Sequence, residues 1–318
     1  MYTEKKTIFI DGSSGTAGLR IYDRLAQRAD ITLLTLPPEL GHDIEAQREM
    51  LNRADIAFLC LPDAAAVTAA DLVENPDTVV LDTSTAHRTA PGWVYGFPEL
   101  SPEREAAIRT AKRIAVPGCH ASGFVVLTYP LVEAGILPPD ALLTCYSLTG
   151  YSGGGKKMIA EYESADRPAH SKLDAPKSYG LGLAHKHLPE MQKISGLTHT
   201  PAFVPVVCDY YSGMQVLVPL DLKLAGTSAE AVAAGIADYY KEGATVSVHA
   251  LNEPLPENGL YSNALSGSDR MELYMTVNAA GDQMMLVSLF DNLGKGSSGA
   301  AIQCMNLMLG MNETEGLE

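Results

Sequence analysis

The chain has 318 residues, of which 46% are hydrophobic, a length that suits two domains of typical size. Its 23 Lys and Arg against 38 Asp and Glu give a net charge of −15, and no basic stripe gathers the positive side chains, so nucleic acid and anionic membranes are not expected partners. Five scattered cysteines without a C-x-x-C pair argue against a disulfide framework and a zinc knuckle, and we expect no metal. With no signal-type or membrane-length apolar segment, we expect a cytoplasmic protein with reduced thiols.

The first third of the chain alternates short apolar runs with segments of helical periodicity. Strands are expected at residues 7–10, 31–36, 56–61 and 79–81. Helices are expected between them over residues 19–26, 46–52 and 64–74, with Asp63 well placed as the N-cap of the last. Near-continuous apolar strands divided by helices indicate a parallel sheet buried on both faces. We therefore predict an α/β fold with a Rossmann-like, doubly wound nucleotide-binding sheet.

A glycine-rich turn follows the first predicted strand and opens the first helix. Its residues are Gly12, Ser13, Ser14, Gly15, Thr16, Ala17 and Gly18. The glycines allow a tight turn and close approach of backbone to phosphates, while the helix N-terminus faces the negative charge. The spacing is G-x-x-G-x-x-G rather than G-x-G-x-x-G, so a plain strand–helix turn remains the alternative to a dinucleotide site.

Loops at the carboxyl ends of the next strands are expected to face the same ligand crevice. Thr35 follows the second strand in a region without an acid to hold a ribose hydroxyl, and this favours NADP over NAD. Leu61 and Pro62 follow the third strand, and Ser84 follows the fourth. Arg88, in that last loop, is a candidate clamp for phosphate or carboxylate, although a lone loop arginine is more often a surface residue.

Cys119 lies where a short apolar run stops at Pro117-Gly118 and a new helix is predicted to begin. Exposed backbone N–H groups at a helix N-terminus favour a thiolate over a thiol, and the thiolate is the nucleophilic form. The alternative is a small buried residue at a tight turn, since free cysteine usually behaves as an inert hydrophobe. The stretch therefore makes Cys119 a candidate nucleophile.

The second half of the chain is richer in strands. We expect them over residues 142–149, 202–209, 214–220, 246–250, 272–279 and 284–290, with a hairpin turn at 280–282. Helices are expected over residues 156–164, 189–195 and 229–241, and an apolar helix over 297–310 is expected to return to the nucleotide domain. The pattern predicts an α+β catalytic domain with a mixed, largely antiparallel sheet over residues 118–296, and a dinucleotide domain over 1–117 and 297–318. Such a sheet also favours a homo-oligomer.

Two groups of residues in the second half of the chain could act together with Cys119. His185 and His187 precede Pro189, which suits a first helical turn. A histidine beside a cysteine raises the thiolate fraction and moves protons, although two polar residues at a helix start are an equally good interpretation. The glycine-rich bend around Gly153 and Gly154 can approach a ligand or be a mobile loop.

Taken together, these stretches resemble the N-acetyl-gamma-glutamyl-phosphate reductases, specifically their shorter form, within the semialdehyde dehydrogenase superfamily. The resemblance runs nearly end to end through the segments 12–18, 96–100, 117–123, 185–191 and 291–296. The longer form usually has Asn before Pro-Gly-Cys and a Pro-Thr pair in place of Ala121-Ser122, and its nucleotide domain is longer. These departures concern the substrate loops and leave the Cys–His pairing untouched.

The resemblance implies an NADPH-dependent reductase of arginine biosynthesis. By that similarity Cys119 is the covalent nucleophile and His187 the acid/base. His185 and Ser122 would contact substrate, with Arg88 near the phosphoryl group. Asn292, Gly153 and Gly154 would lie in the cofactor site with the residues of the glycine loop.

Three alternatives differ in substrate or class. Another acyl-phosphate reductase, such as an aspartate-semialdehyde dehydrogenase, would keep the mechanism and change the substrate. A thiol hydrolase would use the same cysteine and histidine but leaves the glycine loop unexplained. A non-catalytic NADP-binding sensor would bind nucleotide with an unreactive Cys119.

Overall fold

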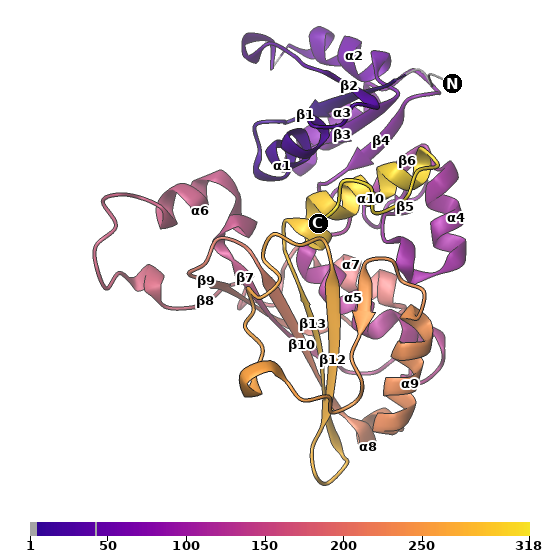
Figure 1. The fold of residues 1–318 in the computed structure, drawn as a ribbon, viewed down its shortest axis with the longest axis vertical. Helices are drawn as coiled ribbons and strands as arrows, with labels where there is room; N and C mark the ends of the chain where they lie inside the picture. Colours follow the sequence, from indigo (N-terminus) through magenta and orange to yellow (C-terminus); the bar gives the residue numbers. More distant parts are fainter. Residues whose placement is uncertain (1–4, 42) are drawn as a thin grey trace. The chain divides into compact units, whose positions relative to one another are not determined.

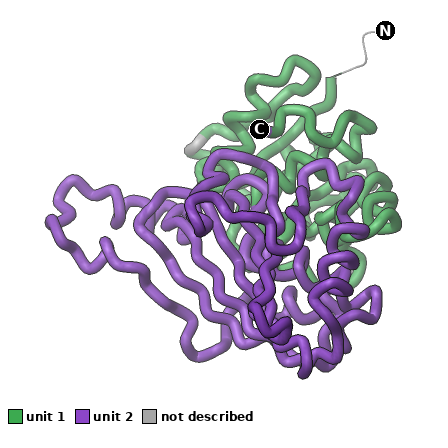
Figure 2. The backbone as a smooth tube through the Cα atoms, turned by 60° about the horizontal axis from the view of Figure 1, so that its bottom comes forward, with its two compact units in different colours: residues 1–118, 297–317 green, residues 119–296, 318 purple. Residues whose placement is uncertain are grey.

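The computed structural model describes residues 5–41 and 43–318. The N-terminal stretch before the first predicted strand, Met1 to Glu4, lies outside the described residues. The chain forms two compact units, one from residues 1–118 and 297–317 and one from residues 119–296 and 318 (Figure 2). No helix among the described residues is both long enough and apolar enough to cross a bilayer.

The first unit is built on a six-stranded sheet in which every pair of neighbouring strands is parallel (Figure 1). The strand order is β2-β1-β3-β4-β6-β5. Their bounds are β1 Lys6–Asp11, β2 Ile31–Leu34, β3 Ile56–Leu59, β4 Val79–Asp82, β5 Val94–Tyr95 and β6 Arg113–Ala115. This confirms the predicted Rossmann-like parallel sheet.

Alternate residues along each central strand enter different hydrophobic clusters. Ile8 and Ile10 of β1 belong to one cluster, whereas Phe9 between them belongs to another. The first cluster also holds residues of α1 (Thr16–Leu25), α4 (Pro102–Thr110) and α10 (Gly299–Met308), and the second holds residues of α2 (Ile44–Arg53) and α3 (Asp63–Asp71). Because strand side chains alternate between faces, helices cover both faces of this sheet.

The cap predicted for α3 was wrong. Asp63 is the first residue of the helix, Pro62 holds the cap position, and no side chain caps the end. The Asp63 carboxylate instead accepts hydrogen bonds from the backbone N–H and the hydroxyl of Thr85. The Asp63 carboxylate thus binds the loop after β4 instead of capping the helix. This contact lies 22 residues away in the sequence, so the local pattern could not predict it.

The second unit contains a seven-stranded mixed sheet in the order β11-β12-β13-β10-β7-β9-β8. Two pairs, β7 with β9 and β11 with β12, are parallel, and the other neighbours are antiparallel. Their bounds are β7 Thr144–Gly150, β8 Lys177–Ser178, β9 Ala202–Cys208, β10 Met214–Asp221, β11 Val246–Val248, β12 Met271–Val277 and β13 Gln283–Phe290. The predicted mixed, largely antiparallel sheet is confirmed. The two-residue strands β5 and β8 were not predicted, because they are too short to show periodicity.

Helix α5 (Cys119–Glu133) is the centre of the second unit. It packs against β10 and β13, and against α7 (Leu188–Ser195) and α9 (Ala229–Tyr240) (Figure 1). A Cβ placed on Gly123 would lie 2.5 Å from a methyl of Val216 and 2.8 Å from the ring of Phe290, so the missing side chain lets the helix sit directly on the sheet. The remaining helices are α6 (Gly155–Tyr162) and α8 (Leu222–Ala225).

Candidate active site

The glycine loop of the first unit is shaped by contacts that exclude side chains. Gly12 has φ of +80°, and a Cβ there would lie 2.3 Å from the carbonyl oxygen of Cys60. A Cβ on Gly18 would lie 2.4 Å from the carbonyl oxygen of Gly12, and the N–H of Gly15 donates to that same oxygen at 2.8 Å. The backbone of the loop is therefore packed against Cys60, the residue after β3, and folded onto the start of α1.

This loop fits the phosphates of a dinucleotide. Ser13 and Ser14 are exposed, and the first turn of α1 carries no acidic residue. The Thr16 hydroxyl oxygen is buried and has no hydrogen-bond partner among the described residues. A buried hydroxyl beside unsatisfied N–H groups is what an anionic ligand at a helix N-terminus would satisfy. Leu61 lies beside Gly12, its Cδ2 being 3.2 Å from the position of a Gly12 Cβ, while Pro62 and Thr35 are exposed.

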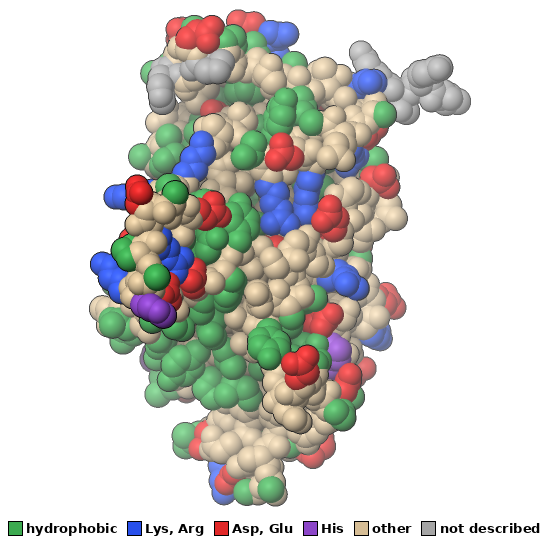
Figure 3. Space-filling view, turned by 60° about the vertical axis from the view of Figure 1, so that its left-hand side comes forward, with side chains coloured by type: hydrophobic (Ala, Val, Ile, Leu, Met, Phe, Trp, Pro, Cys, Tyr) green, Lys and Arg blue, Asp and Glu red, His purple; other side chains and the backbone are tan. Residues whose placement is uncertain are grey.

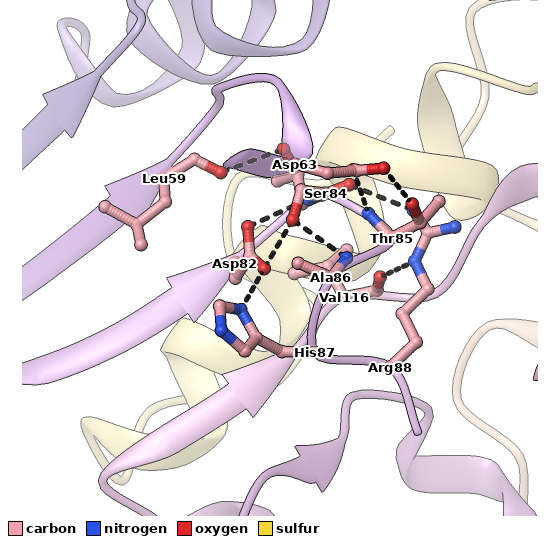
Figure 4. Close-up of polar contacts among 10 residues, drawn as sticks. Leu59, Asp63, Asp82, Ser84, Thr85, Ala86, His87, Arg88 and Val116 are labelled. Atoms are coloured by element: carbon pink, nitrogen blue, oxygen red, sulfur yellow. Dashed lines mark hydrogen bonds and ion pairs between the residues drawn. The ribbon is translucent and has the colours of Figure 1, made fainter. Parts of the chain in front are cut away.

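In the loop after β4, several polar contacts converge on one buried carboxylate (Figure 4). Asp82 is fully buried and accepts the Ser84 hydroxyl at 2.6 Å and the Ser84 N–H at 2.9 Å. The Nδ1 of His87 lies 2.6 Å from the same carboxylate, and its ring stacks on Trp93 at 3.9 Å. The Ser84 hydroxyl, a predicted cofactor contact, is thus engaged within the loop. The Asp82–His87 pair went unnoticed in the sequence because it depends on the turn of the loop.

Arg88 is buried, and two backbone carbonyls hold its guanidinium. Its Nε donates to the carbonyl of Val116 at 3.0 Å and one terminal nitrogen donates to that of Thr83 at 2.9 Å (Figure 4). These bonds tie the loop after β4 to the segment that precedes Cys119 in the sequence. The structure therefore gives Arg88 a bracing function within the first unit, and the phosphoryl contact that the resemblance implied stays a prediction.

In the second unit, Cys119 is the first residue of α5 and is half-buried. The predicted helix start at this cysteine is confirmed. A Cβ placed on Gly296 would lie 2.9 Å from the Cβ of Cys119, so the backbone of the 291–296 segment packs directly on the cysteine. Its thiol is thus presented at the positive end of the most buried helix of the unit.

Three imidazoles gather beside this helix start. The ring centroids of His185 and His187 are 4.8 Å apart, and each lies 5.5 Å from that of His120. The N–H of His187 donates to Nδ1 of His185 at 3.2 Å, which leaves the proton of a neutral His185 on Nε2. Burial and, secondly, the charge of Lys186 lower the pKa of His185. His185 is therefore a neutral donor at neutral pH.

His120 is held at both nitrogens. Its Nδ1 lies 2.7 Å from the Ser147 hydroxyl of β7 and its Nε2 lies 2.9 Å from the Tyr179 hydroxyl. Burial, with a smaller contribution from His185, lowers the pKa of His120 to about 3. Burial and then the charge of Cys119 raise the pKa of Tyr179. None of these three residues was selected from the sequence, although His120 directly follows the cysteine.

The remaining predicted site residues fall at two places in the second unit. Ser122, one turn along α5 from Cys119, is fully buried, and its hydroxyl has no hydrogen-bond partner among the described residues. Asn292 accepts the N–H of Gly213 at 2.9 Å and donates to the Ser152 hydroxyl at 3.0 Å, so its amide braces the bend that carries Gly153 and Gly154. Over the described residues, no group of three or more His, Cys, Asp and Glu side chains is arranged to hold a metal ion.

Comparison with known proteins identifies the family. The semialdehyde dehydrogenase NAD binding domain matches residues 35–108, and the semialdehyde dehydrogenase dimerisation domain matches residues 119–292. An N-acetyl-gamma-glutamyl-phosphate reductase of Burkholderia cenocepacia (strain HI2424) is 44% identical over 96% of this chain and 97% of its own length. One of Trichormus variabilis is 42% identical over 98% of this chain and 99% of its own length.

Solved structures show the same fold. Aspartate semialdehyde dehydrogenase II of Vibrio cholerae superposes with a TM-score of 0.72 at 17% identity, covering 96% of this chain and 99% of that one. The aspartate semialdehyde dehydrogenase of Candida albicans, determined with NADP, superposes with a TM-score of 0.65 at 17% identity, covering 96% of this chain and 99% of that one. With both domain matches and near full-length relatives above 40% identity, this chain belongs to the semialdehyde dehydrogenase family.

Proposed function

We propose that the protein reduces N-acetyl-L-glutamyl 5-phosphate to N-acetyl-L-glutamate 5-semialdehyde with NADPH, a step of arginine biosynthesis. The observation that carries the proposal is Cys119 at the N-terminus of α5, with His185 and His187 near the ring of the adjacent His120, in a chain whose near full-length relatives bear that enzyme's name. A thiol nucleophile, an acid–base pair and a dinucleotide loop are the parts that this reaction requires.

The first half-reaction uses the thiolate of Cys119. The sulfur attacks the carbonyl carbon of the acyl phosphate, a C–S bond forms, and the carbonyl electron pair moves onto oxygen. Backbone N–H groups at the start of α5 stabilise that oxyanion. Its collapse breaks the bond to the phosphoryl oxygen, so inorganic phosphate leaves and a thioester remains on Cys119. Arg88 and the Ser122 hydroxyl are proposed to hold the phosphoryl and acyl parts of the substrate.

The second half-reaction needs a hydride, which NADPH supplies when bound. The residues proposed to hold it are Gly12, Ser13, Ser14, Gly15, Thr16, Ala17, Gly18, Thr35, Leu61, Pro62, Ser84, Gly153, Gly154 and Asn292. His187 supplies the proton that the oxyanion of the reduced adduct takes up, and removes it again as the C–S bond breaks. The aldehyde leaves and Cys119 returns to the thiolate.

The two imidazoles are expected to differ when each is replaced by asparagine. His185 stays neutral and donates from Nε2, so His185→Asn is expected to raise the substrate KM several-fold with a smaller change in kcat. His187→Asn is expected to lower kcat by about 10²- to 10⁴-fold, the usual contribution of a general acid–base group. Steady-state kinetics of both variants measure this. If His185→Asn lowered kcat more than His187→Asn did, proton transfer would be assigned to His185.

The substrate is tested in the reverse direction. N-acetylglutamate semialdehyde with phosphate and NADP is expected to give reduced nicotinamide, and aspartate semialdehyde is expected to give a far smaller rate. Activity with the aspartyl compound alone would make the protein an aspartate-semialdehyde dehydrogenase. Nucleotide binding without turnover of either aldehyde would favour the alternative that the protein is a nucleotide sensor.

The sheet of the second unit suggests how copies associate. Val216 of β10 packs on α5, so Leu217 faces the opposite side, where Tyr146 of β7 is 46% exposed and Leu148 and Val206 are half-buried. Figure 3 shows hydrophobic side chains gathered on this unit. We propose a homodimer or a tetramer built through this face, consistent with the match to a dimerisation domain. Sedimentation equilibrium at micromolar concentration tests it, and a monomer would contradict it.

The proposed reaction needs a thiolate at Cys119, and a thiolate persists in a reducing compartment. The five cysteines, which all lie in the described part of the chain, form no disulfide bond. We propose the cytoplasm as that compartment. Fractionation of cells expressing the tagged chain tests the location, and recovery outside the cytoplasm would contradict it.

A further inference from the structure

Asp291 is a fully buried carboxylate in the second unit that the proposed reaction does not use. Its Oδ1 accepts the backbone N–H of Leu293 at 2.7 Å and that of Gly294 at 3.3 Å. Its Oδ2 accepts the hydroxyl of Ser212 at 3.0 Å and the backbone N–H of Gly267. Ser212 precedes β10, Gly267 precedes β12 and Asp291 follows β13, so one side chain joins three segments that are far apart in the sequence.

The contacts of Oδ1 shape the backbone that covers Cys119. The carbonyl of Asp291 also accepts the N–H of Gly296 at 3.0 Å, so the segment 291–296 curls around Asp291. A Cβ on Gly296 would lie 2.9 Å from the Cβ of Cys119 and 3.1 Å from the ring of Phe290. The backbone of Gly296 therefore closes one side of the cysteine, and hydrogen bonds to Asp291 set its place.

The contacts of Oδ2 hold the turn between β9 and β10, which supports the bend that carries Gly153. Carbonyls of this turn accept, at 2.9–3.0 Å, the backbone N–H groups of three successive residues that lead into the bend, Gly150, Tyr151 and Ser152. Asn292 adds a second link, because its amide nitrogen lies 3.6 Å from the position of a Gly153 Cβ. The bend thus rests on a turn that Asp291 holds at Ser212.

We propose that Asp291 is a positioning residue that holds the backbone packed on Cys119 through Oδ1 and the turn under the bend through Oδ2. A carboxylate suits this place because both oxygens accept hydrogen bonds, whereas an amide accepts at only one of its two polar atoms. The part that concerns the bend rests on the proposed function, in which the bend contacts NADPH. The part that concerns Cys119 does not.

Asp291→Asn tests the hold on Cys119. The variant keeps the shape of the side chain but places an NH₂ group against a backbone N–H, whichever way the amide turns. We expect the segment 291–296 to loosen and iodoacetamide to alkylate Cys119 about tenfold faster, the scale of one hydrogen bond to a charged group. Peptide mass spectrometry measures the rate, and its plateau at high pH reports access because the thiol is ionised there. An unchanged plateau would overturn the proposal.

A buried thiol in the same unit separates local loosening from general destabilisation. Cys145 on β7 is fully buried, so its alkylation in the same sample reports opening of the whole unit. In Asp291→Asn, we expect the rate of Cys119 to rise well above that of Cys145. Equal acceleration of both thiols would mean that Asp291 supports only the stability of the unit, and it would overturn the proposal.

Asp221 provides a matched carboxylate. Its Oδ1 accepts the backbone N–H groups two and three residues ahead at 3.0 Å, and Gln283 donates to its Oδ2 at 2.9 Å. It is the last residue of β10, whereas Asp291 follows the end of β13 that pairs with the start of that strand. Asp221→Asn is therefore expected to lower stability and to leave the alkylation of Cys119 unchanged. Equal acceleration in both Asn variants would contradict a specific role for Asp291.

Ser212→Ala tests the other oxygen, and it does so even if Asp291→Asn does not fold. We expect the Kd of NADPH, measured by fluorescence titration, to rise about three- to tenfold, the scale of one hydrogen bond. Alkylation of Cys119 is expected to keep its original rate, since the contacts of Oδ1 remain. Unchanged NADPH affinity would overturn the part that concerns the bend. Both expected effects in a protein that does not reduce the acyl phosphate would refute only the proposed function.

Discussion

Cys119→Ser is expected to lose more than about 10⁴-fold in turnover, because a serine hydroxyl is not ionised at neutral pH and the covalent intermediate cannot form. The assay is the phosphate-dependent reverse reaction with N-acetylglutamate semialdehyde, followed at the absorbance of reduced nicotinamide. The dinucleotide loop belongs to the other unit, so NADPH binding is expected to remain near its original affinity. Loss of turnover with retained binding is what a missing nucleophile produces.

Cys208 provides the control for this prediction. It is a buried thiol at the end of β9, and no step of the proposed reaction uses it. Cys208→Ala is expected to retain activity and to lose only stability. Near-normal turnover by Cys119→Ser would contradict covalent catalysis by this residue. Equal losses of activity in both variants would indicate a folding defect rather than loss of the nucleophile.

Gly12→Ala is expected to weaken NADPH binding by more than about 100-fold, roughly the loss of two hydrogen bonds to a charged group. The added Cβ would lie 2.3 Å from the carbonyl oxygen of Cys60, so the backbone of the glycine loop or of Cys60 has to move. That movement displaces the N–H groups at the start of α1 from the phosphates. Fluorescence titration with NADPH measures the affinity, and thermal unfolding measures the accompanying loss of stability.

Gly92 separates steric contact from backbone strain. It lies in the same unit and has the same φ of +80°, but no heavy atom lies within 4 Å of its added Cβ. Gly92→Ala is expected to cost about 1–2 kcal/mol in stability, from the positive φ alone, and to bind NADPH normally. Equal loss of NADPH affinity in both variants would mean that the loop does not hold the phosphates.

Local pattern predicted the parts of this protein that follow from backbone conformation and periodicity. Apolar runs located most strands of both sheets, although not the two-residue β5 and β8, and Pro117-Gly118 marked the point at which α5 begins. The glycine spacing was also visible in the sequence. The structure explains it at Gly12 and Gly18, where a side chain would collide with backbone. These features survive because they are set by residues only a few positions apart.

Contacts between residues far apart in the sequence could not be predicted without the tertiary structure. Asp63 looks like a helix cap until the loop after β4 brings Thr85 to its carboxylate. His120 is 27 residues from Ser147 and 59 from Tyr179, so no local pattern relates them.

The sequence alone thus determined the fold class and the candidate nucleophile, through periodicity, turn chemistry and the motifs around Cys119. Only the tertiary structure decided which polar groups meet near the start of α5. The physical reason is that a buried polar group must be satisfied by whatever neighbour the topology supplies. That neighbour is set by strand order and helix packing, which no short stretch of sequence contains.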